Sequence, residues 1–168
     1  MTEFRILVAG IGNIFFGDDA FGVEVARALA QRRLPSNVRV VDFGIRGFDL
    51  TFALLDGYDL TILVDASQRG GKPGTLSVLE PSLAAADDSN RFPAEIETHG
   101  LVPSKALELA GVMGGKLGEI RLVSCEPATL GDAADGRMGL SAPVKNAVAE
   151  ALDLIESLIG DFVRRSHA

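Results

Sequence analysis

Residues 5–23 read RILVAGIGNIFFGDDAFGV and set the arrangement of the whole chain. The apolar run at the start is typical of a buried strand in a parallel sheet. Gly10 and Gly12 follow it, and glycine permits the sharp turn that leads from a strand to a helix. Asp18 and Asp19 come directly before an amphipathic helical pattern. Because open α/β proteins place their sites at the C-terminal ends of strands, both carboxylates are predicted at such an edge.

Length and composition narrow the class of protein. The chain has 168 residues, with 23 Asp and Glu against 16 Lys and Arg, which gives a net charge of −7. One domain spanning residues 1–168 is expected. The acidic balance argues against nucleic acid or an anionic membrane as a partner, since both attract basic surfaces. No apolar run reaches the ~20 residues of a membrane span, and no signal-peptide pattern is visible, so a cytoplasmic protein is expected.

Strand-like and helix-like segments alternate along the chain, which predicts a mostly parallel α/β sandwich. The predicted strands are 4–9, 38–42, 60–64, 75–79 and 119–125, and the predicted helices are 20–33, 48–56, 103–113 and 143–163. The strand at 75–79 follows its predecessor too closely for a helical crossover, so it is expected to pair antiparallel at the edge of the sheet. Residues 81–93 are expected to form an irregular connection and residues 164–168 a frayed tail.

The glycines of the first turn suggest a nucleotide-binding loop, but its other features are missing. The pattern Gly10-x-Gly12-x-x-Phe15 lacks the third glycine of the dinucleotide fingerprint. The turn contains no lysine to hold a phosphate, and Asp18 and Asp19 would repel one. A nucleotide-binding role is therefore disfavoured.

The common protease motifs are absent as well. The sequence has no Gly-x-Ser-x-Gly elbow and no His-Glu-x-x-His helix. Its two histidines are His99 and His167, so a serine triad would have to use His99. The single cysteine, Cys125, excludes an internal disulfide and a multi-thiolate zinc site. It ends a predicted buried strand, which favours a small apolar packing role over a nucleophile.

Three polar residues can meet at one edge of the predicted sheet. Asp19 follows the first strand, Asp65 ends the third, and His99 precedes a helix. Two carboxylates and an imidazole make a mixed oxygen and nitrogen site with open positions, which suits a divalent transition metal. They are too few to close a structural zinc site. A metal here would be loosely held or brought by a partner.

Each of these residues also has a structural alternative. Asp18 or Asp19 can cap the first helix and complement its dipole. Asp65 can accept hydrogen bonds from loop amides, and His99 can be a turn histidine satisfied by the backbone. From these residues alone, a three-residue metal site is the less favoured interpretation.

A second turn, after the predicted strand at 38–42, repeats the combination of an acid and spaced glycines. It contains Asp42, Gly44 and Gly47 in the pattern Asp-x-Gly-x-x-Gly. A strand-to-helix turn with the acid bonded to an amide explains the pattern equally well, so it does not by itself indicate a site.

Taken together, five segments in order resemble the [NiFe]-hydrogenase maturation proteases, the endopeptidases that trim the C-terminus of the hydrogenase large subunit. The segments are 10–22 (GIGNIFFGDDAFG), 42–47 (DFGIRG), 62–66 (ILVDA), 99–101 (HGL) and 139–144 (GLSAPV). They occur in the family's order over nearly the whole chain. Their joint occurrence is specific, although no single segment is.

The resemblance implies a site. The family's nickel-contacting trio corresponds to Asp19, Asp65 and His99, which are also the implied catalytic residues, with their individual roles open. The first acid is often glutamate in the family, so Asp19 is one methylene shorter. Phe15 replaces the usual leucine and is expected to be an adjustment within the core. The expected loops around the substrate cleft contain Gly10, Gly12, Asn13, Asp42, Gly44 and Gly47.

The resemblance also implies a fold and a reaction. The fold would be a three-layer α/β sandwich, with a mostly parallel, twisted, five-stranded sheet and helices on both faces. The reaction would be one endoproteolytic cut by an aspartyl-type or metal-dependent peptidase. It would release a short C-terminal peptide from the large-subunit precursor after nickel insertion. The nickel would come with the precursor and would not be tightly bound by the free protein. The alternative is a nickel-sensing chaperone that binds the large subunit without cutting it.

Overall fold

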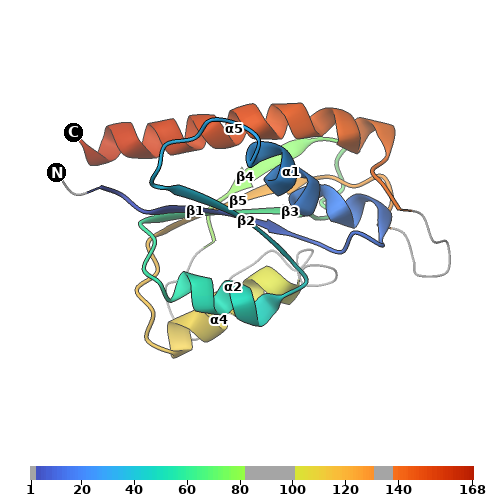
Figure 1. Cartoon of the computed structure of the whole chain (residues 1–168). Coiled ribbons are helices and arrows are strands. Elements are labelled where there is room, and N and C mark those ends of the chain that lie inside the picture. Colours follow the sequence, from blue (N-terminus) through green and yellow to red (C-terminus); the bar gives the residue numbers. More distant parts are fainter. Residues whose placement is uncertain (1–2, 82–100, 131–137) are drawn as a thin grey trace.

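The computed structural model describes residues 3–81, 101–130 and 138–168, which are built around one five-stranded sheet (Figure 1). The strands are β1 (Ile6–Ile11), β2 (Val38–Gly44), β3 (Leu60–Ala66), β4 (Leu76–Leu79) and β5 (Glu119–Cys125). Their order across the sheet is β2-β1-β3-β5-β4. β4 pairs antiparallel with β5, and the other neighbouring strands are parallel. The predicted antiparallel edge strand is therefore confirmed.

Helices cover both faces of this sheet. They are the short 3-10 helix η1 (Gly17–Ala20), α1 (Phe21–Leu29), α2 (Gly47–Leu54), α4 (Leu101–Val112) and α5 (Ala142–Ser166). Figure 1 shows α1 and α5 on one face and α2 and α4 on the other. The three-layer sandwich expected from the sequence is confirmed.

The alternation of side chains along the central strands creates two apolar cores. In β1, Ile6 and Val8 face the core under α1 and α5, whereas Leu7 and Ala9 face the core under α2 and α4. Every residue of β1 and β3 is buried. Strands that are covered on both faces need continuous apolar runs, which is the pattern that the sequence shows.

Close packing of backbone seats α1 directly against the strand ends. A Cβ atom at Gly22 would lie 2.1 Å from the carbonyl oxygen of Val64 and 2.3 Å from that of Ile11. A Cβ atom at Gly10 would lie 2.3 Å from the carbonyl oxygen of Gly22. Gly10 therefore lies inside β1 and packs against α1, so its expected place in a cleft loop is wrong. This packing fixes η1, and the acids it carries, at the ends of β1 and β3.

The end of the chain differs from the prediction. α5 continues through Ser166, so the frayed tail expected at 164–168 is wrong. The last turn has partners that the local sequence does not indicate. Arg165 forms an ion pair with Glu119 at the start of β5 at 3.1 Å, and the ring of His167 packs edge-on against Phe4 with centroids 5.2 Å apart.

Smaller differences concern other boundaries. β1 and β3 each end two residues later than predicted, at Ile11 and Ala66, and α1 ends at Leu29 where the pattern extended to 33. The irregular connection predicted at 81–93 lies, beyond Pro81, outside the described residues. None of the helices in the described part of the chain combines the length and apolar composition that a membrane crossing requires.

Candidate active site

The strand order creates a topological switch point at the C-terminal ends of β1 and β3. From β1 the chain crosses by α1 to β2 on one side, and then returns by α2 on the opposite face to β3 on the other side (Figure 1). Ligands of open α/β sheets bind where the strand order reverses in this way. Asp19 lies in η1, directly after β1, and Asp65 is the penultimate residue of β3.

The turn after β1 wraps around Asp19. The backbone amide of Asn13 donates a hydrogen bond to Oδ2 of Asp19 at 2.9 Å, and Oδ1 of Asn13 accepts one from the amide of Phe15 at 2.9 Å. Gly12 has a φ of 141°, and a Cβ atom there would lie 1.8 Å from the carbonyl oxygen of Asp19. Only glycine fits this position, so Gly12 and Asn13 together hold Asp19 in place.

Asp65 is a buried carboxylate with a strongly perturbed proton affinity. Asp65 is only 3% exposed, and its Oδ1 accepts a hydrogen bond from the amide of Ala66 at 2.8 Å. Burial, and next the negative charge of Asp19, raise the pKa of Asp65 well above its ordinary value, against the opposing effect of the Ala66 amide. The two carboxylates that the sequence placed at strand ends therefore interact.

Such a pair supports two kinds of chemistry. The repulsion between buried Asp65 and partly buried Asp19 would be relieved by a divalent cation, which stabilises both in the ionised form. Alternatively, Asp65 keeps its proton to a higher pH than an ordinary carboxyl group, because its pKa is raised, and serves as a general acid or base. Both depend on Asp19 and Asp65 sharing one environment.

The third predicted residue, His99, lies outside the described residues. α4 begins two residues later at Leu101, at the same edge of the sheet as η1 (Figure 1). Within the ranges that the structure describes, no three side chains of histidine, cysteine, aspartate or glutamate are grouped so that they could hold a metal ion. The trio with Asp19 and Asp65 stays a prediction.

Asp18 has a different role from the helix cap considered for it. η1 and α1 show no side-chain capping hydrogen bond. The fully buried Asp18 carboxylate instead accepts from the amides of Ala128 at 2.8 Å, Thr129 at 3.1 Å and Ser141 at 2.7 Å, and from the hydroxyl of Ser141 at 2.8 Å. It thereby ties the first turn to the loop after β5 and to the start of α5.

The second glycine turn lies directly against the first. Gly44 has a φ of 56°, and its carbonyl oxygen accepts a hydrogen bond from the amide of Gly12 at 3.0 Å. The carboxylate of Asp42 pairs with Nε of Arg27 on α1 at 3.4 Å and is partly exposed. Gly47 begins α2. The predicted cleft loops around Gly12 and Gly44 are therefore neighbours in space, although their contact with a substrate stays a prediction.

Two residues near the site were misjudged or missed in the sequence. Phe15 is 59% exposed, so its expected place in the core is wrong: the tight turn around Asp19 directs it outward. Glu126, directly after β5, is 8% exposed and accepts hydrogen bonds from the amides of Arg69 at 2.8 Å and Gly70 at 3.2 Å. It fixes the loop that follows Asp65. The signal for Glu126 in the sequence was its position as an acidic residue directly after a predicted buried strand.

Cys125 is predicted to be dispensable for catalysis. The residue is fully buried, and burial together with the nearby acids Asp18 and Glu126 raises the pKa of its thiol to about 12. A thiol with that pKa is not ionised at neutral pH and is a poor nucleophile. The Cys125→Ala variant should keep the wild-type activity, and iodoacetamide should leave the native protein active. Loss of activity in a folded Cys125→Ala variant would contradict this assignment.

Comparison with known proteins gives a consistent result over most of the chain. A family model described as hydrogenase maturation protease matches residues 23–158. The hydrogenase 2 maturation protease of Escherichia coli is 30% identical over 152 residues, covering 90% of this chain and 88% of that protein. The hydrogenase expression/formation protein HupD of Rhizobium leguminosarum is 32% identical over 89% of this chain and 71% of its own length. The solved structure of the hydrogenase maturating endopeptidase HybD of Escherichia coli is 29% identical, with a TM-score of 0.78 over 94% of this chain and 93% of that one.

Proposed function

The chain belongs to the hydrogenase maturation protease family and is a peptidase, and from this premise we propose the cut that it makes. The proposed reaction removes a short C-terminal peptide from the nickel-loaded precursor of a [NiFe]-hydrogenase large subunit in the cytoplasm. The nickel belongs to the substrate, and the protease uses it to recognise a precursor that is ready to be cut.

The interacting carboxylates Asp19 and Asp65 are the observation that carries this proposal. They lie at the switch point of the sheet, and the charge of Asp19 contributes to the raised pKa of Asp65. A cation presented by the substrate would relieve their repulsion, so binding would be stronger for a metal-loaded precursor than for an empty one. His99 is the proposed third contact, since an imidazole with two carboxylates suits nickel.

The same residues are proposed to carry the hydrolysis. Nickel held by the precursor would orient the adjoining peptide segment as a template. Asp19, Asp65 and His99 would then bring a water molecule and the scissile peptide together, and one carboxylate would take up the proton of the water. The turns that contain Gly12, Asn13 and Gly44 would border the substrate.

The proposal is tested by offering the purified protein a matched pair of precursors. One large-subunit precursor is loaded with nickel, the other is nickel-free, and the mass of the subunit is measured over time. The expected result is a loss of mass equal to one short C-terminal peptide, in the nickel-loaded sample only. Equal cleavage of both precursors would contradict nickel recognition. A stable complex of unchanged mass would favour the non-cleaving chaperone.

A further inference from the structure

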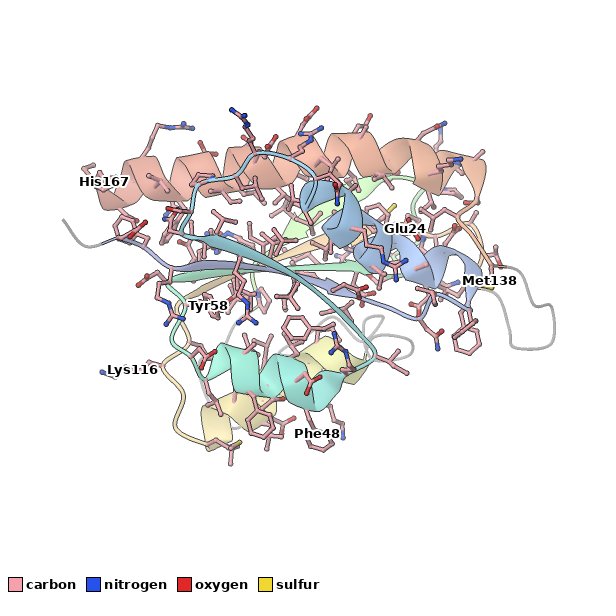
Figure 2. All side chains as sticks on the ribbon, in the orientation of Figure 1. Glu24, Phe48, Tyr58, Lys116, Met138 and His167 are labelled. Atoms are coloured by element: carbon pink, nitrogen blue, oxygen red, sulfur yellow. The ribbon has the colours of Figure 1, made fainter. Side chains whose placement is uncertain are left out.

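The outer surfaces of α2 and α4 are apolar where a surface helix is ordinarily polar. On α2, Phe48 and Phe52 are one turn apart and are 73% and 58% exposed. At the end of α4, Val112 and Met113 are 79% and 51% exposed, and Leu109 lies on the same side. Figure 2 shows Phe48 pointing away from the sheet. Both helices therefore carry apolar residues toward the core and also toward solvent.

The opposite face of the molecule does not share this property. The surface of α1 and α5 carries charged groups, including Arg32, which pairs with Asp153 at 2.9 Å and Glu156 at 2.6 Å. On α1, Glu24 and Arg27 pair at 3.9 Å. Single exposed apolar residues are ordinary on protein surfaces, whereas a contiguous group on one face marks a contact surface.

The apolar surface is hollowed between the two helices. A pocket of about 610 Å³ lies there, and its walls include Phe48 from α2 and Leu109 and Val112 from α4. Lys105 and Glu108 are its charged residues, one of each sign. The volume is enough for several large side chains. The balanced charges suit an apolar ligand that carries no strong charge of its own.

This groove is continuous with the turn that borders the carboxylate site. Ile45 and Gly47 line the groove, and both lie within three residues after Gly44. The carbonyl oxygen of Gly44 accepts a hydrogen bond from the amide of Gly12. Gly12 in turn packs against the backbone of Asp19. One turn therefore forms both the near wall of the groove and the neighbour of the proposed catalytic residues.

We propose that the groove between α2 and α4 docks an apolar segment on the surface of the hydrogenase subunit precursor. This inference rests on the proposed function, because that reaction requires a folded protein substrate to be held beside Asp19 and Asp65. A contact surface that shares a turn with the site orients the precursor while its C-terminal segment is cut. Large apolar side chains of the precursor occupy the pocket beside Phe48 and Val112.

The test uses the full-length protein with the exposed residues changed to glutamate. Phe48→Glu and Val112→Glu place a charge in the groove without altering a buried position. Val78→Glu is the matched control, since Val78 is 40% exposed on β4 and lies on the α5 side of the sheet, as its neighbour Leu76 does. Unfolding temperatures establish that all three variants are folded.

Binding and cleavage are then measured separately. Calorimetric titration with the precursor gives Kd, and mass-resolved kinetics give KM and kcat. Each groove variant should raise Kd and KM by about tenfold or more at an unchanged kcat, since exposed aromatic anchors dominate protein interfaces. The Val78→Glu control should behave as wild type.

Two results would overturn the docking proposal, and a third would overturn only the proposed cleavage. Wild-type Kd and KM in the folded groove variants would remove the docking role and leave the proposed cleavage intact. A wild-type protein that sediments as a dimer, and becomes monomeric in the groove variants, would assign the surface to a second copy of this chain. A wild-type protein that binds the precursor with groove-dependent affinity but never cuts it would retain the docking surface and refute the proposed cleavage.

Discussion

The Asp65→Asn variant is expected to lose cleavage of the nickel-loaded precursor and, at neutral pH, to unfold at a higher temperature than the wild type. Asparagine has the shape of aspartate, and its Oδ1 still accepts the hydrogen bond that the amide of Ala66 donates at 2.8 Å. It lacks the negative charge and the ability to exchange a proton. Loss of a positioned acid or base reduces turnover by roughly 10²–10⁴-fold.

The gain in stability follows from the direction of the pKa shift. The pKa of Asp65 is raised in the folded protein, first by burial and then by the charge of Asp19. Between the ordinary carboxyl pKa of about 4 and the raised one, the folded chain holds a proton that the unfolded chain has released. The stabilisation from that proton is complete below the unfolded pKa and is lost as pH rises through the folded pKa.

Calorimetric unfolding of both proteins between pH 4 and pH 8 tests this. The two Tm values should be similar at the acid end, and the variant should gain on the wild type as pH rises. Each 1 kcal/mol of added stability corresponds to about 2–4 °C in a chain of this size. Asp56→Asn is the control at an exposed aspartate and should show no such trend. If the Tm difference between the variant and the wild type stayed constant or fell as pH rises, the pKa of Asp65 would not be raised in the folded protein.

The sheet and the pair of carboxylates follow from local sequence patterns. The apolar runs of β1 and β3 could be recognised because both strands are buried on their two faces. Parallel strands end at the same edge of a sheet, so acids placed just after β1 and at the end of β3 had to lie near one another. The expected proximity of Asp19 and Asp65 required no knowledge of their side-chain partners.

The surroundings of these carboxylates depend on contacts between distant segments, which local patterns do not reveal. Asp18 bonds to Ser141, a separation of 123 residues. Ser141 is the N-cap residue of α5, but its side chain makes no capping hydrogen bond to that helix. Its amide and hydroxyl both donate to Asp18. Phe15 was misplaced for a different reason, because the turn that points it outward is held by local hydrogen bonds among Asn13, Phe15 and Asp19.

Removing the Asp18 carboxylate is expected to produce the largest loss of stability among single substitutions at the site. Asp18→Ala leaves the amides of Ala128, Thr129 and Ser141 without the acceptor that they share. These hydrogen bonds are part-buried, and each bond to a charged group contributes about 1.5–3 kcal/mol, so a loss of about 3 kcal/mol or more is expected. That is a large part of the ~5–15 kcal/mol that stabilises a typical domain.

Asp18→Asn should destabilise the protein nearly as much as Asp18→Ala. This result would show that the loss comes from hydrogen bonding and not from packing. The asparagine amide group has nearly the volume of the carboxylate, but in either orientation its NH₂ faces a backbone N–H, because Oδ1 and Oδ2 both accept from amides. Ser141→Ala removes only the hydroxyl bond and should cost about 1 kcal/mol. Asp161→Ala, at an exposed ion pair with Arg164, should be close to neutral. Urea unfolding of the four variants gives this order directly, and a stable Asp18→Asn protein would show that the buried carboxylate does not hold the three segments together.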